Sequence, residues 1–267
     1  MDGGSLLNRA EADDSAGLAF ILGFPRSGTT LLGRIVASRP DVAVLEERPL
    51  LAKAVADLYD KPDGAARLAA LTAAEADVYR QDFWQRARAT GIETRGRRVF
   101  EQTALNTVYL PLILKLFPRS PVVFAIRDPR DVVFGCFRRR FAPNRFTREF
   151  HSLESTARLY CDTMRLAELC RERFGFRPLD IRNEDLIADF DTETRRLCAF
   201  TGLVWDESLR DYHRAAEGHT LTTASAAQVR RGLSRDGIGQ WRRYAEQMAP
   251  VLPLLQPWVE RFGYPPA

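Results

Sequence analysis

The stretch Gly23-Phe24-Pro25-Arg26-Ser27-Gly28-Thr29-Thr30 decides the fold. A short apolar run from Leu18 to Leu22 precedes it, and an amphipathic segment from Thr30 to Ala37 follows it. A strand, a glycine loop and a helix in this order turn backbone N–H groups and the positive end of a helix dipole toward an anion. The stretch therefore predicts a phosphate-binding loop.

The loop differs from that of a nucleotide triphosphatase in two respects. A triphosphatase loop has the form GxxxxGK[ST], whereas Thr29 follows Gly28 here. A triphosphatase also places a metal-binding aspartate after a buried strand, but the apolar run from Pro121 to Ile126 is followed by Arg127. Arginine repels a metal and attracts phosphate. Asp128 comes next, so a divergent metal-dependent nucleotide kinase stays open as an alternative.

Short apolar runs alternate with helical segments along the rest of the chain. This pattern predicts an α/β fold, a P-loop-containing parallel β-sheet flanked by helices. The stretch rich in Ala, Glu and Arg from Ala54 to Arg95, interrupted at residues 61–64, predicts a helical cap. Glu46 and Glu47 follow the second strand and would face the loop if the first two strands were parallel neighbours. We expect further strands at residues 42–45, 98–100, 121–126 and 179–181, and further helices at residues 105–117, 132–141, 149–174, 184–201 and 251–262.

Length and composition are those of one globular domain. The 267 residues, 45% hydrophobic and 28% charged, suffice for a single core. We expect a flexible N-terminal segment at residues 1–17 and one domain at residues 18–267. No apolar run approaches the roughly 20 residues that cross a bilayer, and the chain starts with a polar, acidic stretch. We therefore expect a cytoplasmic protein with no signal peptide and no membrane partner.

Charge and cysteine content exclude little but set further expectations. The net charge of +4 suits an anionic ligand, yet nearly all basic residues are arginines, a bias that codon composition can produce. We therefore expect no nucleic-acid partner. The four cysteines form no CxxC pair and no metal-ligand pattern with the three histidines, so we expect buried free thiols and no metal. The oligomeric state is left open, with a homodimer as one option.

Three separated motifs resemble those of the PAPS-dependent sulfotransferases, nearest to the tyrosylprotein sulfotransferases and the bacterial sulfotransferase domains often joined to tetratricopeptide repeats. The resemblance runs from about Leu18 to Tyr264. The stretch from Pro25 to Leu32 is similar to the family's 5′-phosphosulfate loop, and that from Arg127 to Val132 is similar to its 3′-phosphate motif. The resemblance implies 3′-phosphoadenosine 5′-phosphosulfate (PAPS) as co-substrate, adenosine 3′,5′-bisphosphate as product, and a hydroxylated acceptor.

The same resemblance implies roles for single residues. Val44-Leu45-Glu46-Glu47 looks like an acidic pair whose second member is the catalytic base, so Glu47 is the candidate base and Glu46 the alternative. Arg26 is expected to stabilise the leaving phosphate. The stretch from Thr223 to Arg230 resembles the segment that folds over the nucleotide. The implied donor-binding residues are Arg26, Ser27, Gly28, Thr29, Thr30, Arg127, Gly135, Arg139, Ser225 and Arg230.

Three positions depart from the family's pattern. Gly135 stands in place of a serine that binds the 3′-phosphate, Gln102 in place of a lysine that assists transfer, and Asn183 in place of a tyrosine that contacts the nucleotide. These departures keep a second interpretation open, a catalytically silent protein that binds PAPS or its product.

Transfer of a sulfuryl group requires a base for the acceptor and positive charge near the leaving phosphate, and no metal is required. By analogy with phosphoryl transfer, in-line positioning supplies most of the catalysis. We expect a small-molecule acceptor rather than a protein tyrosine, because nothing in the sequence marks secretion or a membrane anchor. The cap and the region from Phe141 to Glu149, with Arg145 and Arg148, are expected to line its entrance.

Overall fold

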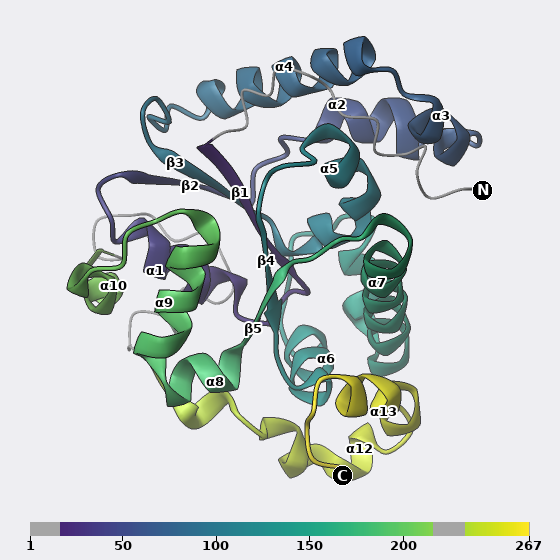
Figure 1. Ribbon diagram of the computed structural model, residues 1–267. Helices are drawn as coiled ribbons and strands as arrows, with labels where there is room; N and C mark the ends of the chain where they lie inside the picture. Colours follow the sequence, from purple (N-terminus) through teal and green to yellow (C-terminus); the bar gives the residue numbers. More distant parts are fainter. Residues whose placement is uncertain (1–16, 216–232, 267) are drawn as a thin grey trace.

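A parallel sheet forms the centre of the computed structural model, which describes residues 17–215 and 233–266 (Figure 1). Within these residues the sheet has five strands in the order β2-β3-β1-β4-β5. Every neighbouring pair is parallel. This confirms the predicted α/β fold. The strands are β1 (Leu18–Gly23), β2 (Val42–Glu46), β3 (Arg98–Gln102), β4 (Val122–Ile126) and β5 (Leu179–Arg182).

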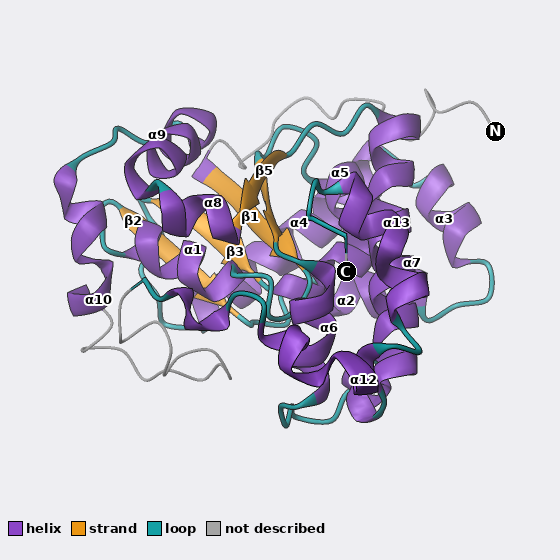
Figure 2. Ribbon diagram, turned by 90° about the horizontal axis from the view of Figure 1, so that it is seen from below, coloured by secondary structure: helices purple, strands orange, loops and turns teal. Residues whose placement is uncertain are grey.

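Helices cover both faces of the sheet, as Figures 1 and 2 show. One layer contains α1 (Thr29–Ala37), α8 (Asn183–Ala188), α9 (Phe190–Thr201) and α10 (Tyr212–Ala215). The other contains α5 (Leu110–Leu116), α6 (Pro129–Phe137), α7 (Leu153–Phe174) and α13 (Leu252–Arg261). The remaining elements are α2 (Ala52–Ala54), η3 (Val55–Tyr59), α3 (Gly64–Ala70), α4 (Ala73–Ala89), η4 (Ala104–Tyr109), η5 (Thr147–His151), η6 (Glu207–Asp211), η8 (Arg235–Gly237), η9 (Gln240–Tyr244) and α12 (Ala245–Met248).

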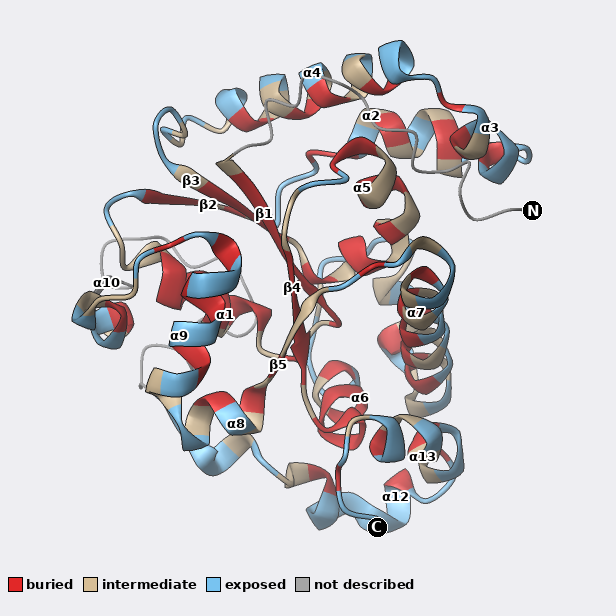
Figure 3. Cartoon of the chain, in the orientation of Figure 1, coloured by how far each residue is buried: buried red, intermediate tan, exposed pale blue. Residues whose placement is uncertain are grey.

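The strand β1 is buried along its whole length (Figure 3). Its side chains alternate between two core clusters: Phe20 and Leu22 belong to the cluster under α5 and α7, and Ala19 and Ile21 to the cluster under α1 and α9. A strand buried on both faces needs an almost entirely apolar sequence, which is why residues 18–22 have one.

The strand order places the loop after β1 at the point where the chain changes direction across the sheet. From β1 the chain passes through α1 to β2 at the sheet edge, returns to β3, and then crosses to β4 on the other side of β1. The strands β1 and β2 are therefore not neighbours, because β3 lies between them. Their carboxyl ends still reach the same edge, where open α/β sheets bind ligands.

Helix α6 differs from its expected bounds of residues 132–141. It begins at Pro129, because the side chain of Asp128 accepts a hydrogen bond from the N–H of Arg130 and proline fits the first helical turn. It ends at Phe137. Arg139 therefore lies beyond the helix rather than within it.

Three other expected helices are divided. Residues 184–201 form α8 and α9, because the side chain of Asp189 accepts from the N–H of Thr192 and starts a new helix. Residues 105–117 begin as a 3₁₀ turn, η4, before α5. The helix expected at 149–174 starts at Leu153, where Ser152 caps the N–H of Ser155 at 3.1 Å, and a 3₁₀ turn precedes it.

The helical cap expected at residues 54–95 is present and packs against the α5 side of the sheet (Figure 1). Its longest helix, α4, begins at a capping box formed by Thr72 and Glu75. Phe83 of α4 lies 4.9 Å from Phe117 and 6.4 Å from Phe20, measured between ring centroids. Burial of this aromatic cluster fixes the cap to β1.

The C-terminal segment is fixed to α6 through Arg130, whose side chain is 1% exposed. Arg130 binds both carboxylate oxygens of Asp128, at 2.9 and 2.8 Å, and donates to the carbonyl of Pro265. Its guanidinium also lies 4.4 Å from the ring centroid of Trp241. Asp131 accepts from the backbone N–H groups of Gly239 and Trp241. The second half of the Arg127–Val132 motif is therefore a structural anchor.

The four cysteines are free, three of them buried and Cys161 half-buried. The expectation of buried free thiols is thus confirmed for three of the four. Among the helices of residues 17–215 and 233–266, none combines the length and the apolar character that a bilayer crossing needs.

Replacing Arg130 by methionine should lower the free energy of unfolding by about 3–5 kcal/mol, because Asp128 would keep a buried charge without its partner. The double variant Arg130→Met, Asp128→Asn should recover most of that loss. Urea unfolding of both variants measures the two values. A single variant within about 1 kcal/mol of the parent would contradict the role of this pair.

Candidate functional site

The loop Gly23–Thr30 joins β1 to α1 through two glycines with left-handed backbone. Gly23 has a φ of 154°, and a Cβ atom there would lie 2.7 Å from the carbonyl oxygen of Ala125. Gly28 has a φ of 111°, and a Cβ atom there would lie 2.9 Å from the side-chain oxygen of Asn183. Only glycine fits both positions without strain. The loop can therefore pack tightly against β4 and α8.

Side chains from two other elements hold the loop from behind. The hydroxyl of Thr107 accepts from the N–H of Gly23 at 3.0 Å and donates to the carbonyl of Gly23 at 2.6 Å. The buried thiol of Cys136 donates to the carbonyl of Pro25 at 3.2 Å. Thr107 is fully buried and lies 84 residues from Gly23 in the sequence. No sequence motif marked it, since its role depends on η4 passing beneath the loop.

Four arginines surround one end of the loop. Burial, and after it the charges of Arg127, Arg139 and Arg138, lower the pKa of Arg26 to about 10. The side chain of Arg26 runs along α6 at Gly135, where an added Cβ would lie 3.4 Å from the Cβ of Arg26. Arginines brought this close repel one another unless an anion lies between them. The cluster is therefore suited to a phosphate.

Arg127 is held between the loop and the C-terminal segment. Its guanidinium donates to the carbonyl of Arg26 at 3.3 Å and to the carbonyl of Gly237. Two backbone contacts from separate parts of the chain fix its direction before a ligand arrives. The interpretation of Arg127 as a ligand-binding residue stays a prediction.

The two glutamates that follow β2 have different environments. Glu46 forms an ion pair with Arg34 of α1, with 2.9 Å between Nη2 and Oε2. Glu47 lines the cavity beside the loop. Its backbone N–H donates to the carbonyl of Gln102 at 2.9 Å. The structure thus holds Glu46 in a salt bridge and leaves Glu47 facing the cavity.

Burial raises the pKa of Glu47 to about 7, a backbone hydrogen bond from Ala104 opposes the rise, and the charge of Glu46 adds to it. The residue is exposed where it opens on the cavity. The rise therefore depends on how much water the cavity holds, and a bound molecule that excludes water should increase it.

Glu47 and Arg26 each have a strained backbone conformation. In the described part of the chain they are the only residues other than glycine with a positive φ, 49° and 73°. Such conformations cost energy and concentrate at functional sites. Both residues line the same cavity.

A third acid, Glu101, lies behind Glu47 and was missed by the sequence analysis, which ended the strand at Phe100. Strand β3 continues to Gln102, so the side chain of Glu101 is fully buried. Asn106 donates to its Oε1 at 3.1 Å. Burial is the main reason that the pKa of Glu101 rises to about 8, and the charge of Glu47 adds to this rise. Glu101 is therefore protonated at neutral pH.

The pKa of Glu101 predicts how its replacement changes stability with pH. The folded chain keeps this proton up to about pH 8, while the unfolded chain loses it near the ordinary glutamate pKa, so stability falls as pH rises between these values. Glu101→Gln removes this loss, and its melting temperature relative to the parent should be higher at pH 8 than at pH 5. Glu172→Gln, at an exposed position, is the control. An equal difference at both pH values would contradict the raised pKa.

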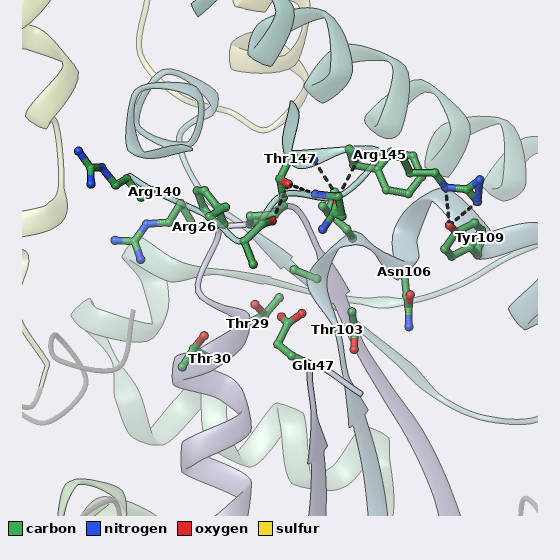
Figure 4. Close-up of a pocket in the computed structure, with 17 residues that line it drawn as sticks. Arg26, Thr29, Thr30, Glu47, Thr103, Asn106, Tyr109, Arg140, Arg145 and Thr147 are labelled. Atoms are coloured by element: carbon green, nitrogen blue, oxygen red, sulfur yellow. Dashed lines mark hydrogen bonds between the residues drawn. The ribbon is translucent and has the colours of Figure 1, made fainter. Parts of the chain in front are cut away.

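The cavity beside the loop has a volume of about 520 Å³. Figure 4 shows Thr29, Thr30 and Glu47 at one end and Arg145 with Tyr109 at the other. The region from Phe141 to Glu149, expected at the entrance, contributes Arg145 and other residues up to Thr147 to the lining, but not Arg148. The expected cap residues contribute Val55 to a smaller adjoining cavity.

The other predicted residues are distributed as follows. Ser27 is buried, and its hydroxyl has no hydrogen-bond partner among the described residues. Arg139 is exposed near Arg26. Gln102 does not line the cavity of Glu47; its amide packs on Gly33 in a separate cavity of about 630 Å³. Ser225 and Arg230 lie outside the described residues.

No group of three His, Cys, Asp or Glu side chains within residues 17–215 and 233–266 has an arrangement that could hold a metal ion. Asp128, the carboxylate that a nucleotide kinase would use, is bound by Arg130 on both oxygens.

The fold and the site define an α/β protein with an anion-binding loop at the carboxyl edge of a parallel sheet. Residues 19–207 match the model of the sulfotransferase family, and the chain belongs to this family.

The chain is also similar to a protein of unassigned activity. An uncharacterized protein of Aquifex aeolicus is 26% identical over 259 residues, which are 92% of this chain and 33% of that protein. The chain thus spans about a third of the length of this relative.

Solved structures share the fold. The sulfotransferase domain of the Synechococcus PCC 7002 olefin synthase has a TM-score of 0.62 at 19% identity, covering 97% of this chain and 99% of that one. Mouse sulfotransferase SULT7A1, in complex with PAP, has a TM-score of 0.56 at 17% identity, covering 96% and 88%. Sulfotransferase STF9 of Mycobacterium avium has a TM-score of 0.56 at 13% identity, covering 98% and 80%.

Proposed function

We propose that the protein transfers a sulfuryl group from PAPS to a hydroxyl acceptor. One observation carries the proposal: Arg26 and Glu47, the two described non-glycine residues with left-handed backbone, line one cavity beside the loop. A positive group and a carboxylate of raised pKa at the same cavity are what proton removal and leaving-group stabilisation require.

The residues present fit the two anionic ends of the donor. The loop, the N-terminus of α1 and the hydroxyls of Thr29 and Thr30 suit the 5′-phosphosulfate. The arginine cluster around Arg127 suits the 3′-phosphate. The buried hydroxyl of Ser27, which has no partner among the described residues, supports an anion at the loop. Gly135 offers no hydroxyl, but Arg26 occupies the space above it.

The proposed reaction needs one base and fixed positive charge. Glu47 takes the proton of the acceptor hydroxyl as its oxygen bonds to sulfur. The bond between sulfur and the bridging phosphate oxygen breaks, which gives a sulfate monoester and adenosine 3′,5′-bisphosphate. Arg26 and the loop N–H groups stabilise the negative charge that develops on the leaving phosphate.

Adenosine 3′,5′-bisphosphate should stabilise the folded chain in the absence of added metal. At 100 times the Kd the gain is about 2.7 kcal/mol, or several degrees in melting temperature. Arg26→Ala and Arg127→Ala should lose most of the shift, whereas Arg88→Ala, which removes an exposed charge on α4, should keep it.

Two outcomes of this measurement would overturn the donor assignment. The first is the absence of a shift in the parent chain. The second is stabilisation by ATP with Mg²⁺ but not by the bisphosphate, which would favour the kinase hypothesis.

Glu47→Gln should lower the transfer rate by about 10²–10⁴-fold, because the acceptor loses its base, and should leave bisphosphate binding intact. Since Glu47 must be deprotonated and its pKa is raised to about 7, the parent rate should rise with pH and level off above that value. Glu46→Gln is the control: it should cost stability by breaking the pair with Arg34 but keep most of the rate. Equal rates for the parent and Glu47→Gln would exclude Glu47 as base.

A catalytically silent PAPS-binding protein is the second candidate. One observation favours it. Gln102, which stands in place of a lysine that assists transfer, lies at the separate cavity with Gly33 and not at the cavity of Glu47. Sulfate transfer to any acceptor would exclude it.

A further inference from the structure

The cavity beside Glu47 continues into a second one of about 270 Å³. The two cavities share Glu47, Thr103, Asn106 and Tyr109. They therefore form one cleft with two arms, and the proposed base lies where the arms meet.

Apolar side chains make up much of both arms. The first arm is lined by side chains that include Leu105, Phe141, Ala142 and Phe146. The second is lined by Pro49, Leu50, Leu51, Ala52 and Val55, together with one further charged residue, Arg48. These surfaces favour a ligand that buries hydrocarbon.

The polar side chains at the far end of the first arm, Tyr109, Asn144, Arg145 and Thr147, already have hydrogen-bond partners within the protein. Arg145 donates to the hydroxyl of Tyr109 at 2.8 Å and forms an ion pair with Asp60, so its charge is balanced. The hydroxyl of Thr147 donates to the carbonyl of Ala142 and accepts from the N–H of Asn144 (Figure 4).

One polar side chain of the region that the arms share is also bound within the protein. Asn106 donates its amide to Glu101. Arg140 extends away from Glu47 on the side of Arg26 (Figure 4). The carboxyl of Glu47 opens on the meeting point of the arms, whereas the hydroxyl of Thr103 is buried and interacts with the carboxyl of Glu101.

We propose that the acceptor is an apolar alcohol or phenol whose single hydroxyl lies at Glu47, with its hydrocarbon body in the cleft. This rests on the proposed function. A sugar or a peptide would bring many polar groups to the apolar walls of both arms, and each group left unbonded weakens binding. A cleft of a few hundred Å³ is of the size that takes small molecules.

The test uses PAPS with 1-butanol, 1-hexanol and 1-octanol as acceptors, and glycerol and glucose as polar controls. The value of kcat/KM should rise about two- to fourfold for each added methylene, and glycerol and glucose should be poor acceptors. Preference for glycerol or glucose, or equal values along the alcohol series, would overturn the proposal.

A pair of variants locates the hydrocarbon body. Ala52 lines the second arm, whereas Ala56, one turn further, does not; both are exposed. Ala52→Asp should lower kcat/KM for 1-octanol roughly tenfold, since a charge would meet the chain, and should change the value for 1-butanol less than about twofold. Ala56→Asp should leave both unchanged. Equal losses for the two alcohols, or for the two variants, would show that the chain does not use this arm.

Binding of adenosine 3′,5′-bisphosphate separates failure of this inference from failure of the proposed function. If the bisphosphate binds but no alcohol is sulfated, or a polar acceptor is preferred, the acceptor class is wrong and the donor site stands. If the bisphosphate does not bind, both are wrong.

Discussion

The site depends on the way in which one hydroxyl, that of Thr107, binds both backbone groups of Gly23. Gly23 is the point where β1 becomes the loop, and it packs against the carbonyl of Ala125 too closely for any larger residue. The loop therefore leaves the sheet from a fixed position. A strained conformation such as that of Arg26 persists only where the surrounding structure determines it from several sides, and this anchor is one of those constraints.

Positive and negative groups lie on opposite sides of this loop. Arg127 and Arg139 come from the end of β4 and the end of α6, whereas Glu47 and Glu101 come from β2 and β3 on the other side of β1. The parallel arrangement brings all of them to one edge without mixing them. Because burial keeps Glu101 protonated at neutral pH, this third acid adds no negative charge beside a site for anions.

The motif that begins at Arg127 has two separate roles at the start of α6. Arg127 turns toward the loop, while Arg130 is buried among Asp128, Trp241 and the C-terminal backbone. The C-terminal segment returns to the binding edge through these contacts, and its carbonyl at Gly237 in turn holds Arg127. The stability of the chain end and the geometry of the anion site are thus coupled.

Local sequence determined the strand, loop and helix around Gly28, the parallel sheet, and Arg26, Arg127 and Glu47 as candidates. The strand, loop, helix, sheet and Arg127 follow from turn chemistry and hydrophobic period, which act over a few residues, whereas Arg26 and Glu47 became candidates through the resemblance to the sulfotransferases. The proposed chemical roles of these residues remain predictions.

Tertiary structure alone decided the position of β3 between β1 and β2, the clamp by Thr107, the burial of Glu101, and the pairing of Glu46 with Arg34 that leaves Glu47 at the cavity. Each of these depends on which distant segments meet. The energy of a hydrogen bond or a buried charge depends on the surroundings that those segments form when they pack together.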